Sequence, residues 1–162
     1  MGQGYSLAES ISFLIVTGIG FFGGALATTF FSDRIERKFS TLTIAVIWGI
    51  VLFVIGFFPS PPVIIVAGFV ASTTIGLLVP MLYTLTAEHF STRSRATGVA
   101  LTDGLGHIGG AAAPFFVLTL GAQVIGGFSG AFVVMGVSGL ITAALLSLST
   151  RATRRSLESV AR

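Results

Sequence analysis

Three long stretches of this 162-residue chain contain no Asp, Glu, Lys or Arg, at residues 10–32, 39–87 and 104–150. A transmembrane helix needs about 20 consecutive, mostly apolar residues, so these stretches have room for about one, two and two such helices. Charged residues make up 9% of the chain, against about 25% in an ordinary soluble domain. So few polar groups cannot cover the surface of a soluble globule. The pattern therefore predicts an all-α protein embedded in a lipid bilayer, and it excludes a nucleic-acid-binding domain and most soluble enzymes.

Turn signals divide the uncharged stretches into five predicted spans. The Pro-Ser-Pro-Pro segment at 59–62 ends one helix because proline lacks the backbone N–H donor, and we expect the glycine-rich segment 121–127 to form a short turn. Ahead of the first span, Ser6 and Glu9 have the spacing of a capping box. The predicted spans lie at about 10–31, 40–58, 62–84, 97–120 and 128–148.

All nine Lys and Arg residues lie in three segments, at 34–38, 93–95 and 151–162. With five spans, these segments follow the first, third and fifth spans and therefore lie on one side of the bilayer. Because basic loops face the cytoplasm, we expect a transmembrane domain at 1–150 with its N-terminus outside and a cytoplasmic basic tail at 151–162, in a bacterial inner (plasma) membrane. An odd number of spans that starts outside is typical of a part of something longer, either a truncated reading frame or a separately encoded half.

The loop after the first span has a distinctive order of residues. Gly24 precedes Asp33 and Arg34, and Arg37 and Lys38 follow. This order resembles the glycine–Asp–Arg–x–Gly–Arg–basic signature of major facilitator superfamily transporters, which joins the second and third helices of each six-helix half. The resemblance implies that these residues belong to a gating motif.

The loop after the third span contains Glu88, Arg93 and Arg95, followed by Gly98. It resembles the Glu–aromatic–Pro–Thr–Arg–x–Arg–Ala–x–Gly element of the sugar and metabolite:proton symporter branch, and the glycine-rich helix that follows is similar to the eleventh helix of that branch. The chain departs from the family pattern at three positions, where Glu36 replaces a glycine, Ser91 a proline and His107 an arginine.

The resemblance covers about residues 5–150 and places the five spans on helices eight to twelve of a transporter, as an incomplete C-terminal half-bundle. It implies transport of a small organic solute (a sugar, an organic acid or a similar metabolite) by alternating access, with proton coupling. It also implies a partner, which is a missing N-terminal half or a partner transporter chain.

The charged loops allow two interpretations. In the simpler one, any short cytoplasmic loop carries basic residues, and Asp33 caps a helix N-terminus. In the functional one, implied by the resemblance, Asp33 pairs with a cytoplasmic Arg when the transporter faces outward. Glu88 with Arg93 or Arg95 then completes a charge cluster with the 33–38 loop.

Asp103 and His107 lie one helical turn apart in the fourth predicted span, so they share a helix face. At about 1.5 Å per residue, His107 approaches the middle of the membrane, where an ionisable group normally faces a cavity or a partner. Either the two residues line the path of a solute or a proton, or Asp103 reaches the cytoplasmic interface and His107 only bonds to it. Thr73 is a further candidate for the solute path, although such hydroxyls commonly bond to their own helix.

Pairs of glycines four residues apart predict close helix packing, and the chain has three such pairs: Gly20 and Gly24, Gly106 and Gly110, Gly126 and Gly130. The chain has no cysteine, and we identify no metal-ligand cluster, no catalytic constellation and no cofactor motif. The expected partners are lipid and a small-molecule solute, without nucleic acid. The alternative function is a non-transport scaffold or assembly subunit, and a membrane enzyme would have to depend on Asp103 and His107 alone.

Overall fold

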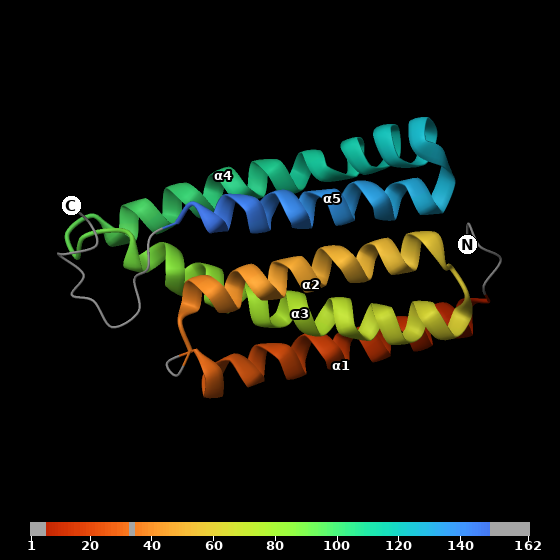
Figure 1. Ribbon diagram of the computed structural model, residues 1–162, viewed down its shortest axis with the longest axis horizontal. Coiled ribbons are helices and arrows are strands. Elements are labelled where there is room, and N and C mark those ends of the chain that lie inside the picture. Colours follow the sequence, from red (N-terminus) through yellow and green to blue (C-terminus); the bar gives the residue numbers. More distant parts are fainter. Residues whose placement is uncertain (1–5, 33–34, 150–162) are drawn as a thin grey trace.

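The computed structural model describes residues 6–32 and 35–149, which form helices joined by short turns (Figure 1). The helices are, in chain order, α1 (Leu7–Phe31), α2 (Arg37–Phe57), α3 (Pro61–Glu88), α4 (Arg95–Phe116), the π-helix η1 (Val117–Gly126) and α5 (Gly127–Ser147). No strand occurs among the described residues. The predicted all-α fold class is confirmed.

Four helical segments are long and apolar enough to cross a membrane: Leu7–Phe30, Arg37–Phe57, Pro61–Glu88 and Arg95–Ser147. The last segment joins α4, η1 and α5 over 53 residues, whereas one crossing needs about 20. It turns back at Gly126 and Gly127, so that α5 runs antiparallel to α4 (Figure 1). The five expected spans therefore correspond to four continuous helical segments, of which the last is folded into two arms.

The start of α1 is fixed by local hydrogen bonds. The backbone N–H of Ser6 donates to the Glu9 carboxylate at 2.8 Å, and the backbone N–H of Glu9 donates to the Ser6 hydroxyl at 3.3 Å. The predicted capping box is therefore confirmed. At the start of α3, Pro61 occupies a first-turn position, where its missing N–H would have no helical partner.

The connection between α4 and α5 differs from the turn expected at 121–127. The chain stays helical to Gly126 in the wider π form, and only Gly126 and Gly127 have positive φ angles, of 128° and 52°. Pro114 lies just before this change, and it lacks the N–H that would bond the Gly110 carbonyl in a regular α-helix. The turn is therefore narrower than expected, and it needs glycine because other residues rarely adopt positive φ.

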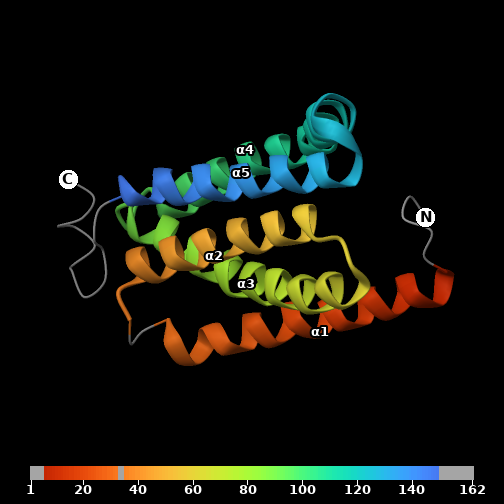
Figure 2. The same cartoon turned by 45° about the vertical axis from the view of Figure 1, so that its right-hand side comes forward.

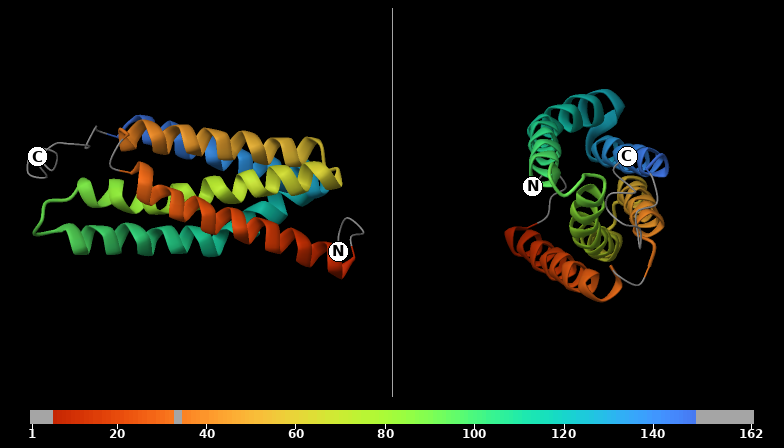
Figure 3. Two further views of the ribbon diagram at one scale, coloured as in Figure 1. Left: turned by 90° about the horizontal axis from the view of Figure 1, so that it is seen from below. Right: turned by 90° about the vertical axis from the view of Figure 1, so that its left-hand side faces the viewer.

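α3 is the central helix of the bundle. It packs against α1 on one side and α2 on the other, and α5 packs against α2 (Figure 2). Viewed along the bundle, α1 and α4 stand apart from each other (Figure 3). α4 makes few contacts with α3, and it is connected to α5 mainly through η1. The arrangement leaves most of α4 exposed.

Glycine allows the backbones of α1 and α3 to touch. A Cβ atom on Gly24 would lie 2.2 Å from the Thr73 carbonyl oxygen, and one on Gly76 would lie 2.2 Å from the Phe21 carbonyl oxygen. The close packing predicted at this part of α1 is confirmed. Other close approaches, which join α2 to α5 and η1 to α5, occur at Gly49, Gly136, Gly121 and Gly130.

The glycines of α4 behave differently. Nothing lies within 4 Å of the positions that a Cβ would take at Gly106 or Gly110, so the close packing predicted for this pair is wrong within the described chain. In the third predicted pair, Gly130 packs closely whereas Gly126 forms the turn. The same spacing therefore occurs in helices with and without a close neighbour.

Candidate functional site

A groove of about 580 Å³ lies between α3 and α4. Its volume falls in the range of small-molecule sites, about 300–1,000 Å³. The groove exists because α4 makes few contacts with α3. It is lined by apolar, glycine and polar residues, namely Val79, Leu82, Tyr83, Thr86, Thr102, Asp103, Gly106, His107, Gly110 and Ala111.

Three polar side chains meet in this groove. The Tyr83 hydroxyl, on α3, donates a hydrogen bond to Asp103 Oδ1 on α4. His107 Nδ1 lies 2.9 Å from the Asp103 backbone carbonyl oxygen and 3.6 Å from Asp103 Oδ1. Because a carbonyl oxygen only accepts hydrogen bonds, Nδ1 is the donor in this contact. Asp103 thus binds the phenol of α3 through its carboxylate and the imidazole one turn along α4 through its backbone carbonyl.

Both ionisable groups are open to the groove, because 38% of the Asp103 side chain and 77% of the His107 side chain are exposed. Counted from Arg95, Asp103 lies about 12 Å and His107 about 18 Å along α4. The hydrocarbon core of a bilayer is about 30 Å thick, so a helix that enters it near Arg95 would carry both groups into this core. Ionisable groups at such depths normally face a cavity or a partner, and here they line the groove.

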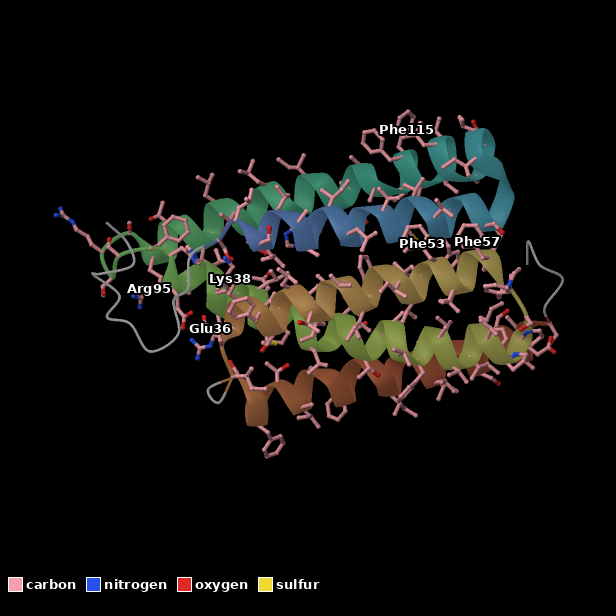
Figure 4. All side chains as sticks on the ribbon, viewed as in Figure 1. Glu36, Lys38, Phe53, Phe57, Arg95 and Phe115 are labelled. Atoms are coloured by element: carbon pink, nitrogen blue, oxygen red, sulfur yellow. The ribbon has the colours of Figure 1, made fainter. Side chains whose placement is uncertain are left out.

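A second candidate site lies at the end of the bundle where α1, α3 and α5 finish and α2 and α4 begin. Glu36, Lys38 and Arg95 all lie at this charged end (Figure 4). The Arg37 guanidinium forms an ion pair with Glu88, and its Nε donates to the Ser32 carbonyl oxygen at 3.1 Å. Arg37 therefore ties the start of α2 to the ends of both α1 and α3.

Two other basic side chains of the charged end bond helix carbonyls. Lys38 Nζ donates to the Ser149 carbonyl oxygen at 2.5 Å, just after α5. Arg95 Nε donates to the Ala87 carbonyl oxygen at 3.1 Å, in the last turn of α3. Cations are favourable at these positions because helix C-termini carry partial negative charge. Three buried atoms here have no hydrogen-bond partner among the described residues: Glu36 Oε1, Glu88 Oε2 and Arg95 Nη2.

Glu88 joins the 33–38 loop directly, through its ion pair with Arg37, whereas we expected it to do so together with Arg93 or Arg95. Arg93 is exposed in the turn between α3 and α4, and Arg95 bonds a backbone carbonyl. The charge cluster therefore does join the 33–38 loop, through Arg37.

Other predicted residues fall in different places. Asp33 and Arg34 lie outside the described residues. Gly24 lies within α1 at its contact with α3. Thr73 also lies at this contact and bonds the Phe69 carbonyl of its own helix at 2.8 Å, and it is not among the described residues that line the groove.

Sequence reasoning did not single out Tyr83. A tyrosine within a membrane-spanning helix is a signal in itself, because its hydroxyl usually finds a hydrogen-bond partner away from water. The partner is on another helix, however, and no local pattern identifies which helix lies opposite. Within residues 6–32 and 35–149, no group of three or more His, Cys, Asp or Glu could hold a metal ion.

Comparison with known proteins extends over almost the whole chain. The family model of the Major Facilitator Superfamily matches residues 2–161. A protein of Bacillus subtilis (strain 168), named "Putative metabolite transport protein YyaJ", is 27% identical over 144 residues. The match covers 89% of this chain and 32% of that protein. The chain therefore spans about a third of the length of the curated relative it matches.

Proposed function

The chain belongs to the Major Facilitator Superfamily, and on this premise we propose that it forms part of a transporter that moves a small organic solute across a membrane by alternating access. The observation that carries this proposal is the groove between α3 and α4. It has the volume of a small-molecule site, and it holds two ionisable side chains at a depth where lipid is a poor environment for them. Members of the superfamily are integral membrane transporters and not enzymes.

In the proposed transporter, Asp103 and His107 line the path of the solute. Histidine is suited to carry a coupling proton because it changes charge near neutral pH, which supports a symport mechanism. The resemblance to the sugar and metabolite:proton symporter branch supports a sugar, an organic acid or a similar metabolite as the solute. Thr73 is left out of the path because its hydroxyl bonds its own helix at the α1–α3 contact.

The charged end of the bundle is proposed to act as a gate latch. The ion pair between Arg37 and Glu88 joins two helices that would have to move relative to other parts of a transporter. The buried Glu36 and Arg95 atoms without partners leave room for further pairs in another state. Such pairs bias a two-state motion by a few kcal/mol at most.

The proposed orientation places the charged end in the cytoplasm of a bacterial cell, since basic loops face inward. The N-terminus is then outside and the C-terminal tail inside. The exposed α4 is proposed to face further helices of the transporter, supplied by a preceding N-terminal half or by a partner chain. The coverage of 32% of the relative is consistent with this proposal.

A chimeric transporter tests the proposed function. In the chimera, this chain replaces the matching segment of the Bacillus subtilis relative, and metabolite depletion from the medium is followed by mass spectrometry. We expect the chimera to deplete at least one small organic solute, and its Asp103→Asn variant to lose most of that activity. Glu9→Gln makes the same chemical change outside the groove and is expected to leave depletion unchanged. A depletion profile equal to that of cells without the chimera, at equal membrane expression, would argue against transport.

A further inference from the structure

The hydrogen bonds within the groove leave mostly acceptor groups available to a solute. The inference drawn from this rests on the proposed role of the groove as part of a solute path. The Tyr83 hydroxyl donates to Asp103 Oδ1, and His107 Nδ1 donates to the Asp103 carbonyl oxygen. The Thr102 hydroxyl donates to two carbonyl oxygens of its own helix, at 3.0 and 2.9 Å. These three donors are therefore already engaged within the protein.

The groups that remain are mostly acceptors. They are Asp103 Oδ2, the lone pairs of the Tyr83 and Thr102 oxygens and, when the His107 ring is neutral, its Nε2. Gly110 also lines the groove, and Pro114 lacks the N–H that would bond the Gly110 carbonyl oxygen in an α-helix. Among the side chains that line the groove, Thr86 alone has a donor hydrogen without an acceptor in the described structure.

The charges of the groove are equally one-sided. Among the described residues that line it, Asp103 is the one carboxylate, there is no Lys or Arg, and His107 adds no positive charge while its ring is neutral. Arg37, Lys38 and Arg95 make their hydrogen bonds at the charged end. A carboxylate in a membrane needs a counter-charge. A neutral solute supplies none, and an anionic solute adds repulsion.

We infer that the groove binds a solute that carries a protonated primary or secondary amine. The N–H groups of the ammonium donate to the Asp103 carboxylate and to the neighbouring acceptors, and its charge balances the carboxylate. The compact body of the solute lies against the apolar lining residues Val79, Leu82 and Ala111. This narrows the proposed function to amine-bearing metabolites, ahead of neutral sugars and organic acids.

Two matched sets of probes test this inference, and each set varies charge on one molecular frame. The first set is ethanolamine, ethylene glycol and glycolate, and the second is glucosamine, glucose and glucuronate. Binding to the full chain in phosphatidylcholine nanodiscs is measured by saturation-transfer NMR, with empty nanodiscs as the blank. We expect the ammonium member of at least one set to bind about tenfold more tightly than its neutral or anionic counterpart, the size of effect typical of a charge-assisted hydrogen bond.

Four variants locate the effect. Asp103→Asn removes the carboxylate and is expected to abolish the preference for the ammonium. Glu9→Gln makes the matched change outside the groove and should keep the preference. His107→Gln keeps an acceptor but removes the ionisable ring, and should weaken binding of the ammonium member by less than Asp103→Asn does. Gly106→Leu adds a side chain where nothing lies within 4 Å of its Cβ, so it fills the groove without a clash, and it should abolish binding of all probes.

The possible outcomes distinguish a failure of the ammonium inference from a failure of the proposed function. Equal binding within each set, or tighter binding of the anion, overturns the ammonium class and leaves a solute groove in place. If the preference for the ammonium survives Asp103→Asn, the ammonium does not bind in this groove. If Asp103→Asn does not fold, a preference that survives Gly106→Leu leads to the same conclusion. Absence of binding by every probe overturns both the ammonium class and the role of the groove in a solute path.

Discussion

Two glycine-rich regions of the molecule, the α1–α3 contact and α4, use the same residue type in opposite ways. At the α1–α3 contact, a Cβ on Gly24 or Gly76 would lie 2.2 Å from a carbonyl oxygen of the facing helix. On α4, nothing lies within 4 Å of the Cβ positions of Gly104, Gly106, Gly109 and Gly110. Glycine permits backbone contact in the first region, and it leaves a smooth, open wall in the second. The difference separates a contact that stabilises this chain from a surface available for a solute or another helix.

The largest expected effect comes from filling the α1–α3 contact. Gly24→Leu places a side chain where the Thr73 carbonyl lies, and we expect it to lower the free energy of unfolding by about 3 kcal/mol. Gly23→Leu is the matched control, because nothing lies within 4 Å of its Cβ on the same helix. Unfolding in detergent, followed by circular dichroism, measures both variants. Equal stability of the two variants would contradict the close contact.

A smaller effect is expected at the connection between α4 and α3. Arg95→Ala removes the hydrogen bond to the Ala87 carbonyl, which is worth about 1–2 kcal/mol. Hydrogen exchange should become faster in the first turns of α4 and stay unchanged at the α1–α3 contact. Arg93→Ala, in the same turn but exposed, should change neither region. If Arg95→Ala accelerated exchange in all helices alike, α4 would not be the separately anchored element described above.

The smallest expected effect has the opposite sign. Gly109→Ala adds a methyl group to open space on α4 and removes a residue that disfavours helix, so we expect a gain of about 0.5–1 kcal/mol in unfolding free energy for this chain. The measurement is the same detergent unfolding curve. A loss of stability instead of a gain would mean that α4 has a close neighbour at this position.

Much of the fold can be predicted from the sequence, because its determinants are local. Uncharged stretches predict the helices, the Ser6 and Glu9 pair predicts the start of α1, and the prolines at 59–62 predict the break before α3. The turn before α5 is shorter than predicted. The glycines at 121–127 predict a turn over the whole segment, whereas the chain stays helical to Gly126 because π-type bonding continues past Pro114.

The candidate site is less predictable because it depends on which helices face each other. The spacing of Asp103 and His107 places both on one face, but the Tyr83 hydroxyl reaches Asp103 from another helix. In the same way, Glu88 has basic residues nearby in the sequence and pairs with Arg37, which lies far from it along the chain. Residue spacing predicts neighbours within a helix, whereas tertiary packing decides which residues of different helices meet.

The central claim is that the face of α4 with Asp103 and His107 belongs to a water-accessible solute path. The chain has no cysteine, so each introduced cysteine is the only thiol. In membranes of cells that produce the chain together with the proposed N-terminal helices, Gly106→Cys lies in the groove, whereas Leu105→Cys lies at nearly the same depth outside it. We predict that a membrane-impermeant maleimide labels Gly106→Cys at least tenfold faster than Leu105→Cys. Equal rates, or faster labelling of Leu105→Cys, would contradict the claim.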